Sequence, residues 1–298
     1  MPSQIEPLAN PNSAQTTASG SGLSHGKPSP IASTGLHGET ERPGQLILNA
    51  DDWGRDRETT DRTAECIRCT TVSAVSAMVF MQDSERAAEL AREIETDAGL
   101  HLNFTTAFSL PGCPARLAGR QQDVARYLLR HPLARLVFHP GLASSFEYVV
   151  AAQMEEYQRL YGVKPARIDG HHHMHLCANV RWAHLLPQGT LVRRNFSFRA
   201  GEKSWLNRYY RGAVDRQLAR RHRLVDFLFS LPPLEPASRL QQIFATARQA
   251  VVELETHPVN AEEYRFLSGG EMLRQLGDQA IARGFAAGLV PLPLAASA

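Results

Sequence analysis

One predicted strand and the histidines that follow it decide the interpretation of this chain: Ala166-Arg167-Ile168-Asp169-Gly170-His171-His172-His173-Met174-His175. A single histidine on an apolar face is usually a core residue. Four histidines within five positions after an apolar strand instead indicate a functional role. His171, His173 and His175 alternate, so an extended backbone would point them to one side. Because imidazole suits zinc and similar transition metals, the cluster predicts a metal or catalytic role.

Outward from this stretch, strand patterns and helix patterns alternate along the chain. Apolar or β-branched runs predict strands at 46–48, 72–80, 98–104, 166–170, 190–196, 224–229 and 251–255. Helical patterns lie at 60–69, 84–94, 145–161, 205–221 and 237–250, whereas the proline-containing stretch 111–140 is expected to be less regular. The alternation predicts a parallel sheet covered by helices. About seven strands favour an α/β fold with a single domain, a distorted TIM-like (β/α) barrel.

Polar residues lie at the carboxyl ends of four predicted strands: the pair Asp51-Asp52, His101, His171 and His257. In a (β/α) barrel these ends meet on one face, where such enzymes place their chemistry. We therefore expect these side chains to gather at one site. Taken alone, two of them have simpler interpretations, because Asp51-Asp52 is acceptable in a turn and His101 lies between leucines on a buried strand.

The residue types in this group suit metal-assisted hydrolysis. Two adjacent carboxylates after a strand cannot both face the same way, so one of Asp51 and Asp52 can bind a metal while the other accepts a proton. One Asp and two His ligands leave an open position for water, and the metal polarises a carbonyl group and lowers the pKa of that water. The spare carboxylate can act as a base and a spare imidazole, such as His257 held extended by Pro258, as an acid.

Four short motifs occur in series along the chain: Leu48-Asn49-Ala50-Asp51-Asp52-Trp53-Gly54, Ala98-Gly99-Leu100-His101-Leu102-Asn103-Phe104-Thr105, Ile168-Asp169-Gly170-His171-His172-His173-Met174-His175 and Glu253-Leu254-Glu255-Thr256-His257-Pro258. In this order they resemble the motifs of the YdjC-like carbohydrate deacetylases, which include chitooligosaccharide and hopanoid-associated deacetylases. The resemblance extends from about residue 45 to about residue 288. Each motif alone would be weak, but the series is specific.

The resemblance implies a distorted (β/α) barrel that removes acetyl groups from N-acetylated sugars with one divalent metal ion, magnesium or zinc. It implies that Asp52, His101 and His171 are the metal ligands. Asp51 then acts as the general base towards a metal-activated water, and His257 as the acid that protonates the leaving amine.

Three further residues are expected to contact the substrate: Trp53, His173 and Arg193. Trp53 stands where the family commonly has phenylalanine. The proline-rich and basic segment between the His101 and His171 motifs differs from the family pattern, so it is expected to shape the substrate pocket.

Two other classes of function remain open. A metal-dependent phosphoesterase on a similar barrel would also use Asp and His, but it usually needs a two-metal site, and the sequence offers no evident second bridging set. A non-catalytic carbohydrate-binding protein would be indicated by loss of the base, but Asp51 is present.

The composition of the chain limits the classes of partner that it is expected to bind. The chain has 32 basic and 30 acidic residues, a net charge of +2, which gives no electrostatic case for nucleic acid or an anionic membrane as the main partner.

We expect a cytoplasmic protein, because no segment reaches the ~20 apolar residues of a membrane helix and no secretory signal is evident. The sequence is also compatible with a homodimer. Residues 1–43 are expected to be a disordered tail and residues 44–298 the barrel domain. Cys66 and Cys69 form a CxxC pair that we interpret as ordinary thiols.

Overall fold

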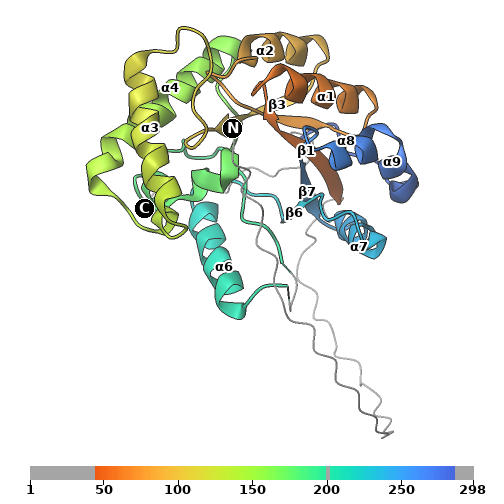
Figure 1. The fold of residues 1–298 in the computed structure, drawn as a ribbon. Helices are drawn as coiled ribbons and strands as arrows, with labels where there is room; N and C mark the ends of the chain where they lie inside the picture. Colours follow the sequence, from red (N-terminus) through yellow and green to blue (C-terminus); the bar gives the residue numbers. More distant parts are fainter. Residues whose placement is uncertain (1–43, 199–201, 286–298) are drawn as a thin grey trace, which may run out of the picture. The chain divides into compact units, whose positions relative to one another are not determined.

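The computed structural model describes residues 44–198 and 202–285. The predicted tail, residues 1–43, lies outside the described residues. Within them, seven parallel strands form one sheet in the order β5-β4-β3-β2-β1-β7-β6 (Figure 1). Their bounds are β1 Gln45–Trp53, β2 Ala74–Ala77, β3 Asp97–Leu102, β4 Arg167–Gly170, β5 Leu191–Val192, β6 Phe227–Ser230 and β7 Val251–Thr256.

The two edges of this sheet are joined by irregular hydrogen bonds rather than by a full ladder. The Arg223 backbone N–H donates to Thr190 O at 3.1 Å, and the Val192 N–H donates to Arg223 O at 2.9 Å. Further along, the Ser197 N–H donates to Leu228 O at 2.8 Å. The sheet therefore curls into an incomplete seven-stranded barrel, which confirms the predicted distorted (β/α) barrel.

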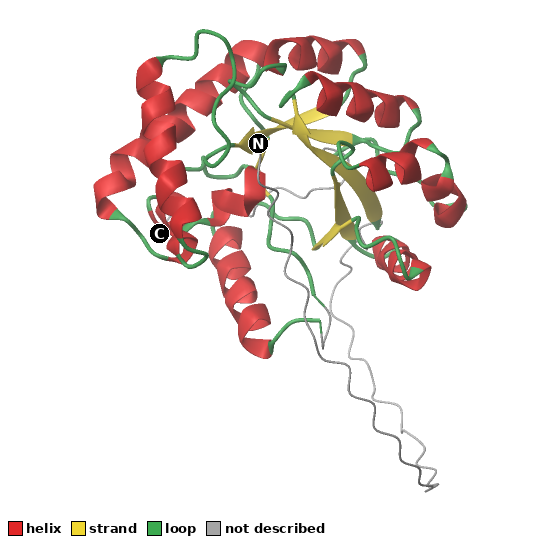
Figure 2. Cartoon of the chain, in the orientation of Figure 1, coloured by secondary structure: helices red, strands yellow, loops and turns green. Residues whose placement is uncertain are grey.

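Helices cover the outer face of the curled sheet (Figure 2). Their bounds are α1 Arg57–Arg68, α2 Ser84–Glu93, α3 Ala115–Arg130, α4 Ala143–Tyr161, α5 Ala178–Trp182, α6 Trp205–Ala219, α7 Ala237–Ala247, α8 Ala261–Ser268 and α9 Glu271–Leu276, with 3-10 turns η1 Ala134–Leu136, η2 Pro140–Leu142 and η3 His171–Leu176. Local chemistry fixes several helix ends: Asp56 caps α1 by accepting a hydrogen bond from the Thr59 N–H at 2.8 Å, and Gly162 ends α4 with a left-handed φ of 74°. No helix in the described part of the chain is both long and apolar enough to cross a membrane.

Two predictions of secondary structure from the sequence were wrong, one for a helix and one for a strand. The stretch expected to be irregular contains the 16-residue helix α3, because Pro114 precedes its first residue and Pro132 follows its end. Proline is compatible with both positions, so it marks the boundaries of this helix rather than its absence. The strand expected at 190–196 is regular over only two residues, at the edge where the barrel closes irregularly.

Strand alternation divides the buried residues into two groups. Leu46, Leu48 and Ala50 of β1 belong to the large core beneath the helices. Ile47 belongs to a second cluster, in which residues from non-adjacent strands meet: Ile47, Ala74, Leu191, Val225, Val251 and Phe285. Since several of these begin their strands, the cluster closes the barrel interior at the amino-terminal end. The interior positions nearer the carboxyl ends are polar, and they form the candidate site.

Candidate metal centre and active site

Three side chains converge at the carboxyl ends of neighbouring parts of the barrel: Asp52 from β1, His101 from β3 and His171 directly after β4. His171 Nδ1 lies 2.8 Å and His101 Nε2 lies 3.4 Å from the same atom, Asp52 Oδ1. One ligand atom from each residue lies within 4.8 Å of the other two, so the group could hold a metal ion. Asp52 Oδ1 is buried yet accepts no hydrogen bond of normal geometry. Two imidazoles that face such an oxygen could serve with it as ligands of one cation.

The backbone at Asp52 explains how two adjacent carboxylates reach one site. The β1–β2 register shifts between Ala50 and Trp53, and Asp52 has the left-handed φ of 66°, a conformation that Asp tolerates better than most residues. As a result, both Asp51 Oδ2, at 3.8 Å, and Asp52 Oδ1, at 3.4 Å, approach His101 Nε2. The argument that the two side chains cannot face the same way was therefore wrong, because it assumed a regular strand.

Asp52 is an ionised carboxylate in this arrangement. Burial raises the pKa of Asp52, but the contacts with His101 and His171 outweigh it and hold the pKa well below its ordinary value. Its second oxygen, Oδ2, accepts a hydrogen bond from Arg55 Nη1 at 2.6 Å. Arg55 thereby orients the carboxylate so that Oδ1 faces the two imidazoles.

His101 is oriented by the acid behind it. Its Nδ1 lies 2.7 Å from Asp169 Oδ1, and Asp169 Oδ2 accepts hydrogen bonds from Ser76 Oγ at 2.6 Å and Arg167 Nη1 at 2.9 Å. Such an outer partner fixes the ring so that its other nitrogen faces a metal. Burial lowers the pKa of His101, but Asp51, Asp169 and Asp52 raise it to about 10. The negative charges that stabilise a proton on the His101 ring would also stabilise a metal cation beside it.

Asp51 is held by a buried arginine. Arg193 donates to Asp51 Oδ2 at 2.6 Å and to Oδ1 at 2.7 Å. It also donates to Glu253 Oε1 at 2.8 Å and Glu255 Oε2 at 3.1 Å. These acidic groups raise the pKa of Arg193 well above its ordinary value although burial lowers it. The residue is 2% exposed, so Arg193, expected to contact substrate, instead supports Asp51 from inside the barrel.

Trp53 also lies in a place that leaves no ring surface for a bound substrate. The residue is 0% exposed, and its Nε1 donates a hydrogen bond to Ala87 O at 3.1 Å. The indole ring thus ties β1 to α2 within the core.

The histidine cluster does not adopt the extended geometry that was expected. His171–Leu176 form a 3-10 segment in which His172 and His173 have left-handed φ values of 55° and 56°. The imidazoles consequently face different groups. His172 Nδ1 lies 3.0 Å from Thr105 Oγ1, His173 Nε2 lies 3.3 Å from Glu255 Oε2, and buried His175 Nε2 lies 2.9 Å from Arg193 O. Of this cluster, His171 joins Asp52, and the prediction that alternate histidines point to one side was wrong.

His257 lies close to Asp51 and Glu255, with one ligand atom of each residue within 4.8 Å of the other two. It follows β7, and its backbone N–H donates to Glu263 Oε2 at 2.9 Å. Its imidazole is partly exposed and lies 4.0 Å from Glu255 Oε1. Burial lowers the pKa of His257, but the charges of Asp51 and Glu255 outweigh it, so the pKa is raised. The protonated form of this imidazole is therefore more favourable than that of an ordinary histidine.

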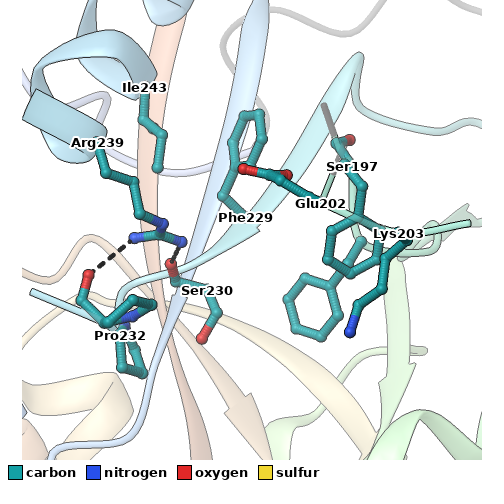
Figure 3. Close-up of a pocket in the computed structure, with 11 residues that line it drawn as sticks. Ser197, Glu202, Lys203, Phe229, Ser230, Pro232, Arg239 and Ile243 are labelled. Carbon is teal, nitrogen blue, oxygen red and sulfur yellow. Dashed lines mark hydrogen bonds between the residues drawn. The ribbon is translucent and has the colours of Figure 1, made fainter. Parts of the chain in front are cut away.

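A cavity of about 440 Å³ lies between β6, α7 and the segment after β5, and Figure 3 shows Phe229, Ser230, Arg239 and Ile243 in its lining. Its walls include Phe196, Phe198 and Phe229, together with Pro232 and Pro233. Phe229 belongs to β6, whose last residue pairs with Glu255 in the β6–β7 register. The ring of Phe196 packs edge-on against His173, with centroids 4.6 Å apart. The cavity thus approaches the site through Phe196, whose ring contacts His173.

Sequence reasoning missed the interior charges that organise the site. Arg167 and Glu253 stand within the quoted stretches of sequence but were assigned no role. The missed signal is a period of two: Arg167 and Asp169 alternate on β4, as do Glu253 and Glu255 on β7. Charged residues at alternate positions of strands that read as buried indicate a polar barrel interior.

Fold and site together define a (β/α)-barrel protein with an Asp-His-His group that could hold a metal. Within that class, the chain belongs to the YdjC-like protein family, whose model matches residues 45–280. This confirms the resemblance drawn from the four motifs.

Curated relatives carry deacetylase names. A chitooligosaccharide deacetylase of Proteus mirabilis (strain HI4320) is 30% identical over 131 residues, which cover 44% of this chain and 50% of that protein. A carbohydrate deacetylase of Mus musculus is 29% identical over 145 residues, covering 46% and 44%. The chain therefore spans about half the length of the curated relatives it matches.

A solved structure shares the fold. It comes from Enterococcus faecalis V583, is named for cellobiose-phosphate cleavage, and superposes with a TM-score of 0.56 at 18% identity, covering 80% of this chain and 97% of that one. At this identity the likeness shows the fold alone.

Proposed function

We propose that this protein is a metal-dependent hydrolase that removes acetyl groups from N-acetylated sugars. The observation that carries the proposal is the convergence of Asp52, His101 and His171, with Asp51 and His257 facing them from β1 and the end of β7. The deacetylase names of the relatives support the substrate class.

Asp52, His101 and His171 would hold one divalent ion. Two imidazoles and one carboxylate are typical of zinc and related transition metals, whereas magnesium prefers oxygen ligands; we therefore favour zinc. When bound, the ion supplies a Lewis acid for the acetyl carbonyl group and lowers the pKa of water.

Asp51 is the general base in this proposal. Its carboxylate lies beside the ligand group, 3.8 Å from His101 Nε2, and so within reach of a water that attacks the acetyl carbon. The paired contacts with Arg193 hold both carboxylate oxygens in one orientation before the substrate arrives. Because the carboxylate is already held in this orientation, it does not need to change rotamer before it accepts the proton.

His257 is the general acid, and its position orients the substrate. As an imidazolium it donates a proton to the amide nitrogen, which leaves as the amine. That nitrogen carries the sugar ring, so the sugar lies on the His257 side. The cavity with Phe196, Phe198 and Phe229 reaches His173 through Phe196 and offers aromatic faces to the apolar C–H face of a pyranose.

The two-metal phosphoesterase is disfavoured by Arg193. A second group, Asp51, Glu255 and His257, also has ligand atoms within 4.8 Å of one another. However, the guanidinium of Arg193 lies 2.6 Å from Asp51 and 3.1 Å from Glu255. A second cation there would be repelled by this buried charge, which favours one ion.

The test is a screen that measures the release of two products, acetate and phosphate. The purified protein is incubated with N-acetylated mono- and oligosaccharides and, separately, with aryl phosphates, each with and without a chelator. We expect chelator-sensitive acetate release and no phosphate release. Phosphate release without acetate would favour the phosphoesterase, and saccharide binding without any release would favour a binding protein; either result would overturn the proposal.

A further inference from the structure

The amino-terminal half of α6 leaves large apolar side chains uncovered. Trp205, Leu206 and Tyr209 are 68%, 60% and 65% exposed. The buried residues of this helix all come from its carboxyl-terminal half: Val214, Asp215 and Leu218. Figure 1 shows α6 extending away from the curled sheet, so the described chain packs against its last turns and leaves its first turns in solvent. Exposed apolar surface bordered by polar residues is typical of an interaction site.

These exposed side chains lie on one face of the helix. Trp205 and Tyr209 are one helical turn apart, and Leu206 and Arg216 fall beside them at helical spacing. The guanidinium of Arg216 lies 6.0 Å from the centre of the Tyr209 ring, as a shared face requires. The buried residues belong to the opposite face. We call Trp205, Leu206, Tyr209 and Arg216 the outward face of α6.

The charge around this outward face is positive. Residues 203–221 contain six basic residues and one acid. The acid, Asp215, is buried and accepts a hydrogen bond from Arg194 at 3.0 Å. Arg208 and Arg216 are exposed, and no carboxylate in the described part of the chain lies at ion-pair distance from either of them. The net charge of +2 for the whole chain therefore conceals a local excess of positive charge on α6.

We propose that the outward face of α6 binds the surface of an anionic phospholipid bilayer. Trp and Tyr rings are favourable at the level of the lipid headgroups, because one end of each ring is apolar and the other can stay hydrated. Arginines beside them are attracted to the lipid phosphates and to the negative potential of the surface. A helix that lies in the interface with an apolar face and basic flanks uses both attractions.

The same features argue against a second copy of this chain as the occupant. In a symmetric dimer through this face, Arg208 and Arg216 of one copy would meet the same positive face of the other. A bilayer with anionic lipids instead supplies negative charge and accepts neighbouring apolar side chains together. Lys203, which closely precedes Trp205, lines the cavity of about 440 Å³, so a bilayer bound here would lie next to that cavity.

The first test is co-sedimentation of the full chain with vesicles of phosphatidylcholine alone and with vesicles of equal parts phosphatidylcholine and phosphatidylglycerol. Four proteins are compared: the wild type, Trp205→Ser/Tyr209→Ser, Arg208→Gln/Arg216→Gln and the control Leu273→Ser/Arg274→Gln. The control alters one apolar and one basic side chain that are exposed on α9.

We expect the wild type and the control to bind the mixed vesicles, more weakly as salt is added, and not to bind phosphatidylcholine alone. The arginine variant should bind about ten- to thirtyfold more weakly, and the aromatic variant more than about tenfold more weakly. Equal binding of all four proteins would place the contact elsewhere on the chain. Absence of binding to either vesicle would exclude the bilayer, and equal binding to both vesicles would exclude the role of charge. Each of these three results would overturn the proposal.

The second test reports on Trp205 itself. In Trp182→Phe the remaining tryptophans are Trp205 and Trp53, and Trp53 is 0% exposed. We expect mixed vesicles to shift the fluorescence emission of this variant to shorter wavelength, because the Trp205 ring leaves water, and to leave that of Trp182→Phe/Trp205→Ser unchanged. Vesicle binding without this shift would overturn the proposal. Self-association without vesicles that is lost in Trp205→Ser/Tyr209→Ser would assign the face to a second copy and overturn it as well. Neither test measures acetate release, so their outcomes are independent of the proposed function.

Discussion

The guanidinium of Arg193 contacts both carboxylate oxygens of Asp51, through Nη1 at 2.6 Å and Nη2 at 2.7 Å. The same side chain also contacts Asp169, Glu253 and Glu255. One buried cation is therefore shared by four buried acids from three strands. This pairing fixes the candidate base and holds the acidic interior of the barrel together.

Replacement of Arg193 should destabilise the fold. Arg193→Met leaves several buried carboxylates without a counter-charge, and breaking such a group typically costs ~3–5 kcal/mol. We expect a loss of this size in the free energy of unfolding, measured with urea. The control is Arg159→Met, which removes an exposed arginine paired with Glu85 and Glu156 and should cost under ~1 kcal/mol. Equal losses in the two variants would contradict the assigned role of Arg193.

The amount of bound metal should distinguish the roles of two neighbouring histidines, His171 and His172. His171→Ala removes one of three ligands, so we expect the purified variant to lose most of its bound ion. His172→Ala is the matched control, because His172 faces Thr105 rather than Asp52 and should leave the metal in place. Elemental analysis of both proteins makes the comparison. Full occupancy in His171→Ala would reject the ligand set.

Stability should fall in mild acid because of His175. Burial lowers the pKa of His175 to about 3, whereas an unfolded histidine takes up a proton near pH 6.5. The contribution of neutral His175 is therefore complete above pH 6.5 and is lost as the pH falls from 6.5 towards 3.

The measurement is urea unfolding at several pH values. We expect the free energy of unfolding of the wild type to fall more steeply between pH 6.5 and 4.5 than that of His175→Gln, by up to ~1.4 kcal/mol per pH unit. Glutamine keeps a donor for the Arg193 carbonyl but cannot be protonated. Parallel curves would show that His175 does not stay neutral in the folded state.

Asp51 should be needed for turnover but not for metal. Asp51→Asn removes the proton acceptor and leaves Asp52, His101 and His171 intact, so acetate release should fall by about 10²–10⁴ with the ion retained. Glu253→Gln is a control that alters another partner of Arg193. Because burial raises the pKa of Glu253 to about 7, the neutral amide is a mild change, and we expect less than a tenfold loss. Similar losses in both variants would assign Asp51 a structural role only.

Some of this architecture follows from local rules, and these parts were predictable. Asp52, His101, His171 and His257 could be placed together because each ends or follows a strand, and parallel strands of a barrel bring their carboxyl ends to one face. Gly162 could be placed at a helix end because the left-handed conformation there favours glycine.

Other parts depend on tertiary contacts that local patterns do not encode. The left-handed turn at Asp52 brings two adjacent carboxylates to one imidazole, and a regular strand would separate them. The η3 turn sends His171 and His175 to different partners, although their spacing suits an extended strand. Arg193 was expected to contact substrate, and arginine is rarely buried; four acids contributed by β1, β4 and β7 make its burial here tolerable.

Our main proposal for this protein is that Asp52, His101 and His171 hold a metal ion with which it deacetylates sugars. Its most direct test is acetate release from N-acetylated saccharides, measured on one preparation as purified, after removal of the ion by a chelator, and after return of zinc or magnesium. We expect acetate release from the purified protein, loss of that release when the ion is removed, and recovery when a divalent ion is returned. Acetate release that continues at full rate after the ion has been removed would contradict it.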